Sequence, residues 1–166
     1  MATENLLSPA LTNRDASTIN NLILTKGAVR EAIGYVTTTS SVTAGSTYRL
    51  AEVPSSARLS DVKISCAAMG GVSAADFGFY RNTKDGGAVV DADFVAASQS
   101  LASALTDSDI STQTSFTIPK RNQPLWQALG FGSDPNTTFD FVATTTATIT
   151  TGGFLSATAI YVDNSN

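Results

Sequence analysis

The feature that most limits the fold of this chain is a strict alternation of apolar and polar residues across positions 58–67. Val62, Ile64 and Cys66 fall on one side of an extended chain, and the polar residues between them fall on the other. Successive side chains of a β-strand point to opposite faces, so this pattern predicts a strand with one buried face. A helix would instead space its apolar residues three or four positions apart.

Similar stretches recur along the chain, and Gly, Pro, Ser or Asp residues separate them at short intervals. Several short strands with regular turn signals are typical of a β-sandwich or barrel. We therefore expect an all-β protein, a jelly-roll-like β-sandwich of about eight strands. The predicted strands are 29–39, 47–53, 58–67, 76–81, 88–94, 114–118, 139–148 and 154–162.

Three further stretches lie between these strands. Residues 123–129 form the best helix candidate, because Pro124 suits a first helical turn and Gly130 suits the end of a helix. Residues 107–109 are expected to form a turn. Residues 96–104 fit a short helix, a strand or a loop equally well.

The chain divides into an N-terminal arm, residues 1–26, and a β-sandwich domain, residues 27–166. The arm fits either a short helix from about Asp15 to Leu24 or an extended segment that docks on the same subunit or another one. Deleting residues 2–24 is expected to leave a folded body that binds its partner more weakly. The residues expected to make the arm's contacts are Leu6, Leu7, Leu11, Ile19, Leu22, Ile23 and Leu24.

Charge is sparse, and its distribution does not suit nucleic-acid binding. Only 14% of residues are charged and the net charge is −4. The ten basic residues are scattered, and Lys120-Arg121 is their only adjacent pair, whereas phosphate binding needs clustered cations.

No apolar run reaches the length of a membrane helix, and no secretory signal is visible. The single cysteine, Cys66, permits no internal disulfide and is expected in the core.

Catalytic apparatus is not evident in the sequence. Histidine is absent, which removes the Ser-His-Asp and Cys-His arrangements and most zinc sites. No Ser-Lys motif or Gly-rich phosphate loop appears. We expect no enzyme activity, no cofactor and no metal. Two carboxylate pairs, Asp91 with Asp93 and Asp107 with Asp109, have a spacing that could serve Ca²⁺, but such sites need several more oxygen ligands.

Trp126 has two interpretations. It could form a platform on which a sugar stacks, or it could anchor a short helix that covers one end of the sandwich. Apolar neighbours, Leu125 and Leu129, favour the structural interpretation.

Taken together, residues 45–71, 74–96, 123–131 and 137–162 resemble small virion proteins of tailed bacteriophages that are encoded near the major capsid protein. The resemblance covers roughly residues 27–162 and includes no catalytic motif. It implies a head-associated structural role, with a β-sandwich body and symmetric assembly on the shell.

On this basis we expect a capsid decoration (cement) protein that is made in the host cytoplasm and binds the outer face of the head. The acidic charge favours a position away from the packaged genome. Its expected partners are the major capsid protein and itself, as a dimer or trimer, with its arm reaching a neighbour, and neither nucleic acid nor membrane. The alternative is a head-fibre or tail-associated adhesin module that binds host glycans.

Overall fold

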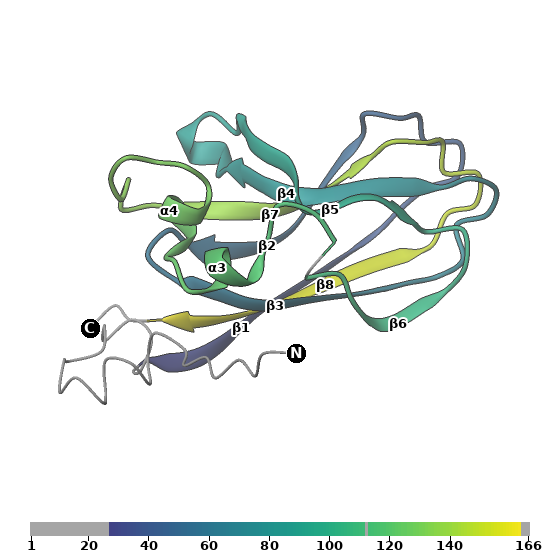
Figure 1. Cartoon of the computed structure of the whole chain (residues 1–166). Coiled ribbons are helices and arrows are strands. Elements are labelled where there is room, and N and C mark those ends of the chain that lie inside the picture. Colours follow the sequence, from purple (N-terminus) through teal and green to yellow (C-terminus); the bar gives the residue numbers. More distant parts are fainter. Residues whose placement is uncertain (1–26, 112, 164–166) are drawn as a thin grey trace, which may run out of the picture.

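The computed structural model describes residues 27–111 and 113–163. Within these residues the chain forms two layers of β-sheet, with short helices at one end of the sandwich (Figure 1). The strands are β1 (Ala28–Thr37), β2 (Thr47–Pro54), β3 (Arg58–Cys66), β4 (Ala74–Arg81), β5 (Val89–Ser100), β6 (Leu105–Asp109), β7 (Thr138–Thr145) and β8 (Phe154–Asp163).

The strand order is that of a jelly roll. One sheet has the order β1-β8-β3-β6 and the other β2-β7-β4-β5. The antiparallel pairs are nested: β1 pairs with β8, β2 with β7, β3 with β6 and β4 with β5. A long hairpin that is rolled up on itself produces this nesting, and it is the arrangement of an eight-stranded jelly roll. The predicted all-β sandwich of about eight strands is therefore confirmed.

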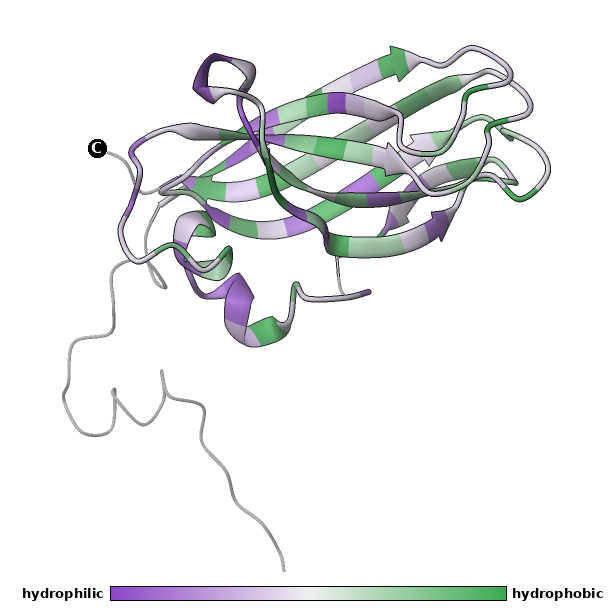
Figure 2. Cartoon of the chain, turned by 90° about the horizontal axis from the view of Figure 1, so that it is seen from above, coloured by the Kyte–Doolittle hydropathy of each residue, from purple (hydrophilic) through white to green (hydrophobic). Residues whose placement is uncertain are grey.

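The core lies between the two sheets and is rich in phenylalanine. Phe77 and Phe79 of β4 project inward with Phe141 of β7, and the Phe79 and Phe141 ring centroids are 5.4 Å apart. The opposite sheet contributes Val62 and Ile64, which are buried as their alternation predicts. Figure 2 shows that hydrophobic and hydrophilic residues alternate along the strands. Each buried side chain of this size contributes about 1.5–3 kcal/mol to folding.

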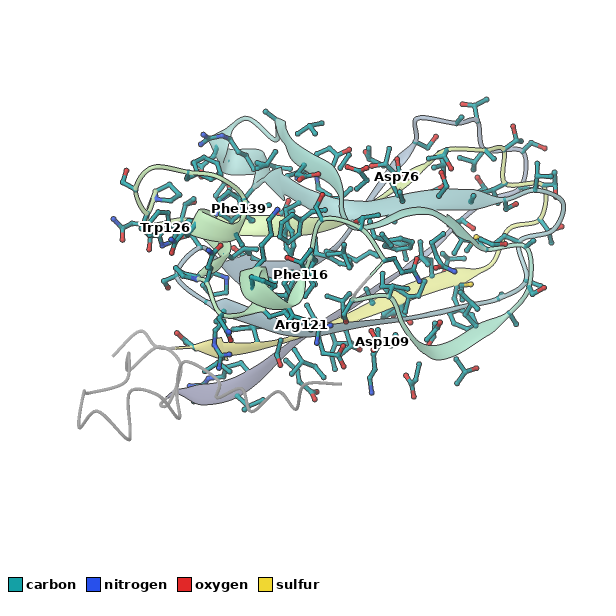
Figure 3. The ribbon with its side chains drawn as sticks, in the orientation of Figure 1. Asp76, Asp109, Phe116, Arg121, Trp126 and Phe139 are labelled. Carbon is teal, nitrogen blue, oxygen red and sulfur yellow. The ribbon has the colours of Figure 1, made fainter. Side chains whose placement is uncertain are left out.

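The described residues contain a 3₁₀ turn, η1 (Thr83–Asp85), and two short α-helices, α3 (Ile118–Arg121) and α4 (Leu125–Ala128), whereas the sequence predicted one helix. The predicted helix over 123–129 corresponds to α4. The chain ahead of β3 holds α4 in place, because the amide of Leu125 donates to the carbonyl of Ala57 at 2.8 Å. Trp126 packs against the core at that end of the sandwich (Figure 3), as the structural interpretation required.

Two local predictions are wrong. Residues 114–118 were expected to form a strand. Residues 114–117 instead form a loop and Ile118 begins α3, because Pro119 suits a first helical turn. Residues 107–109 were expected to form a turn, but they belong to β6. Among the described strands, β6 is paired with β3 alone, and most of its residues are exposed, so it lacks the apolar alternation that marks a strand. The ambiguous stretch 96–104 contains the end of β5, the link after it and no helix.

A β-bulge interrupts the alternation of inward and outward side chains in β2. The register with β7 shifts between Arg49 and Ala51, which face Val142 and Phe141. The extra residue, Leu50, turns inward and is buried. A bulge of this kind breaks strict alternation, so the faces of β2 could not be sorted by spacing alone.

Candidate interaction surface

The outer face of β1 carries large apolar side chains in an exposed row. Val29, Ile33 and Tyr35 are 71%, 67% and 76% exposed. They alternate along β1 with Ala32, Gly34 and Val36, which turn toward the sandwich interior. A strand at the edge of a two-layer fold normally presents polar residues outward, so this row is a candidate contact surface.

The row continues onto β8, the only strand paired with β1 in the described residues. In the antiparallel register, Val29 lies opposite Val162 and Glu31 lies opposite Ile160. Directly opposed residues of such a pair project from the same face. Phe154, at the far end of β8, is 47% exposed and lies opposite Thr37. We call this surface the β1–β8 face. It comprises Val29, Glu31, Ile33, Tyr35, Phe154, Ile160 and Val162, together with Ser156 and Thr158, which lie opposite Tyr35 and Ile33.

Beyond β8 the same side of the sheet becomes charged. Lys63 of β3 lies opposite Thr158 of β8 on one side and Asp109 of β6 on the other. Arg58 lies opposite Val162. The β1–β8 face is thus an apolar strip that is bounded by polar and charged residues toward β6, which is the composition of a protein contact with a polar rim.

The edge of β1 is unpaired in the part of the chain that the structure describes. β1 ends its sheet, and ten of its residues are in register with β8 along the other edge. An exposed strand edge offers free backbone N–H and C=O groups to any other extended segment. The β1–β8 face therefore combines apolar side chains with a backbone edge that no described strand pairs with.

A polar pocket lies at the opposite sheet and has a volume of about 280 Å³. Its polar groups are largely engaged with one another. The Asn82 amide donates to Thr137 and Thr138, and Glu52 accepts from the Thr138 hydroxyl. No aromatic residue lines this pocket, so it lacks the stacking platform that sugar sites use. The lining residues are Glu52, Asn82, Thr83, Lys84, Thr138 and Asp140.

The two carboxylate pairs have different surroundings. Asp91 and Asp93 share a hydrogen bond on β5; burial, and then the neighbouring carboxyl, raises the pKa of Asp91. Asp109 accepts a hydrogen bond from the amide of Ser111 at 2.8 Å, and hydrogen bonds from Ser111 lower the pKa of Asp109. Asp107 is not one of the partners in these hydrogen bonds. Across residues 27–111 and 113–163, no group of three or more metal-ligating side chains gathers.

The remaining sequence predictions concern single residues. Cys66 is buried, as expected, and burial raises the pKa of its thiol. Within the described residues, no helix is long and apolar enough to span a membrane. The seven arm residues, Leu6 to Leu24, lie outside the described residues, so their predicted contacts stay a prediction. The sequence did not single out Val29, Ile33 or Tyr35 as contact residues, although their alternation with small residues on an edge strand was the available signal.

Comparison with known proteins gives little further information. No family model matches the chain, and no curated protein matches it. Among solved structures, a chain of the "Cyanophage Pam1 capsid asymmetric unit" is similar, with 11% sequence identity and a TM-score of 0.48. The match covers 82% of this chain and 85% of that one. A likeness this distant supports no assignment by itself.

Proposed function

We propose that this chain is a structural protein of a bacteriophage head, a decoration protein that binds the outer face of the shell and stabilises contacts between capsomers. The observation that carries the proposal is the β1–β8 face, an exposed apolar strip on the outer side of a jelly-roll body. The sequence resemblance to phage virion proteins supports the same role. We further propose that the protein is not an enzyme, which agrees with the lack of histidine in the sequence.

Shell binding of this kind depends on multivalency. A dimer or trimer would present several copies of one face at a local symmetry axis of the shell. Once one copy is bound, the next binds at a high effective concentration, so a weak single contact becomes a strong assembly. The net charge of −4 fits the outside of the shell better than the genome side, where DNA phosphates would repel it.

The test is the copy number of this protein relative to the major capsid protein, measured by quantitative mass spectrometry in purified particles of the encoding phage. A ratio near one, or a simple fraction such as a third, is expected for a protein that coats the shell. A handful of copies per particle would refute decoration and would indicate a vertex, fibre or tail component. Absence from the particle would refute a virion role altogether.

A further inference from the structure

The β3 side of the β1–β8 face carries two arginines whose guanidinium groups lack hydrogen-bond partners. The Nε atoms of Arg58 and Arg121 are both buried, and neither atom has a partner. Within the described residues, neither side chain forms an ion pair or any other hydrogen bond. Buried donors in native proteins are nearly always paired, so two such atoms in one region need a physical explanation.

The fold brings these two arginines to the same region. Arg58 is the first residue of β3, and Arg121 is the last residue of α3, which packs against β3. The chain after α3 stays close, because the amide of Leu125 donates to the carbonyl of Ala57, directly before Arg58. Figure 3 shows Arg121 where α3 meets the sheet that contains β3. Both guanidinium groups therefore lie near the start of β3.

Arg58 projects from the same side of the sheet as the β1–β8 face. It lies opposite Val162, a member of that face, and the next residue, Leu59, is buried in the core. Directly opposed residues of an antiparallel pair share a face. Arg58 therefore borders the apolar strip, at the position where protein contacts usually have their polar rim.

Both side chains are held in place before any ligand binds. Burial of Nε fixes the stem of each arginine, and the Arg121 guanidinium lies 5.2 Å from the centroid of the Phe116 ring. An ordered arginine loses little conformational freedom when its terminal nitrogens bind a ligand. Arg49 differs, because its guanidinium already donates to Asp140 and to two backbone carbonyls of the fold.

The carboxylates on this side of the sheet have other partners. Asp61 accepts hydrogen bonds from the Ser111 hydroxyl and the Val62 amide, and Asp109 accepts from the Ser111 amide. Hydrogen bonds from Ser111 do most to lower the pKa of Asp109, and the charge of Arg121 adds to that effect. No ion pair joins Asp109 and Arg121 within the described residues. The two arginines thus keep donors for an anion from outside the chain.

We propose that Arg58 and Arg121 together bind a carboxylate, the side chain of an Asp or Glu on the protein that docks on the β1–β8 face. Planar guanidinium groups match the two oxygens of a carboxylate. A phosphate has related chemistry, but the net charge of −4 opposes approach to a nucleic acid. The identity of the docked protein as a shell subunit rests on the proposed function, whereas carboxylate binding by the isolated chain does not.

The first test uses the isolated full-length protein and glutarate, which carries the carboxylate of a glutamate side chain. NMR at mildly acidic pH follows the Nε–H signals of the arginines. Glutarate added at constant ionic strength should shift the Arg58 and Arg121 signals along one saturation curve. Arg81 is the internal control, because its guanidinium also lies over a phenylalanine ring, 5.5 Å from the centroid of Phe131, but β4 belongs to the other sheet.

Glutamine variants then show whether the two arginines share one ligand. Arg121→Gln should weaken glutarate binding at Arg58 by about tenfold or more, and Arg58→Gln should do the same at Arg121. Arg81→Gln should change neither. Independent saturation of the two signals, no saturation, or an equal response at Arg81 would overturn the proposal. The titration of the unmodified protein decides the matter even if a variant folds poorly.

The second test measures binding to heads that lack this protein. Arg58→Gln and Arg121→Gln should each weaken binding by about tenfold or more, and Arg81→Gln should change it little. Unchanged head binding by the first two variants would overturn the docking role. Loss of self-association in place of head binding would assign the acidic residue to a second copy, which also overturns that role. If the unmodified protein did not bind heads, the decoration proposal would fail, and the glutarate titration would still decide the carboxylate site.

Discussion

Gly34 of β1 lies against the backbone carbonyl of Leu50 in β2, where the edges of the two sheets approach each other. A Cβ atom at Gly34 would lie 1.4 Å from the Leu50 oxygen, far inside contact distance. Glycine at this position is what lets β1 approach β2 so closely. Because the obstacle is backbone rather than a flexible side chain, relief would require the strands to separate.

The first prediction follows from this contact. Gly34→Ala should lower the free energy of unfolding by at least about 2 kcal/mol, since overpacking of this kind costs about 1–3 kcal/mol or more. Urea denaturation followed by Trp126 fluorescence would measure the change. Gly132→Ala is the control, because no atom lies within 4 Å of a Cβ there, and it should change stability by less than about 0.5 kcal/mol. Equal midpoints for both variants would contradict the prediction.

The sequence predicted those parts of the fold in which one face is buried and the other is polar. The alternation around Val62 and Ile64 marked β3, and paired phenylalanines marked β4 and β7. Burial on one face imposes a period of two on the sequence, so these strands could be found from spacing alone.

The sequence did not predict a strand that is defined by hydrogen-bonded pairing rather than by burial of one face. β6 consists of residues such as Thr106 and Asp107 that contact little of the core, and hydrogen bonds to β3 hold it. The β1–β8 face could be located only once the register was known. Alternation shows that Ile33 and Val36 are on opposite faces of β1, but the strand order shows which face is outside.

The second prediction concerns the pH dependence contributed by Asp91. Its pKa is raised above the ordinary 3.8, so the folded state binds this proton more tightly than the unfolded state does. The stabilising effect is present below pH 3.8 and is lost as pH rises through the raised pKa. Asp91→Asn should therefore stabilise the protein at pH 7, by less than about 1 kcal/mol because solvent screens the partly exposed pair. The gain should vanish near pH 3.

Urea midpoints at both pH values would measure this effect. Asp93→Asn serves as a companion variant, because it removes the neighbouring charge and should give a gain of the same sign at pH 7. A loss of stability in both variants at pH 7 would mean that the ionised pair is held favourably, contrary to the prediction.

The third prediction concerns Ser111, a buried residue that links two carboxylates to the backbone. Its hydroxyl accepts from the amide of Val62 at 2.6 Å and donates to Asp61, and its own amide donates to Asp109. Ser111→Ala should cost about 1–3 kcal/mol, since it removes the hydroxyl that bridges Val62 and Asp61. The pKa of Asp109, now depressed, should rise toward its ordinary value.

Carboxyl NMR titration would follow Asp109 directly. A depressed carboxyl pKa contributes stability above pH 3.8, and this stability is lost as pH falls through the folded-state pKa. The difference in free energy of unfolding between Ser111→Ala and the unmodified protein should therefore shrink in acid. Ser115→Ala, at an exposed position in the following loop, should change neither the titration nor the stability. An unchanged Asp109 titration in Ser111→Ala would show that another group depresses this pKa.

The fourth prediction tests the β1–β8 face as the surface that binds the shell. Ile33→Lys places a charge at the centre of the apolar strip, on a side chain that is already 67% exposed. Folding stability should change by less than about 0.5 kcal/mol, because no core contact is lost. Binding to heads that lack this protein should weaken by about tenfold or more per site, which corresponds to roughly 1.4 kcal/mol. Several sites bind together, so the loss for an oligomer should be larger.

Val72→Lys is the matched control. Val72 is 80% exposed and lies in the loop before β4, outside the β1–β8 face, so it offers the same chemical change on an equally open apolar side chain. Sedimentation of heads with each variant would measure binding. Selective loss in Ile33→Lys would tie binding to the strip, because both variants add one positive charge to the same acidic protein. Equal loss in both variants would instead mean that net charge governs binding, and retention by both would place the contact elsewhere on the body.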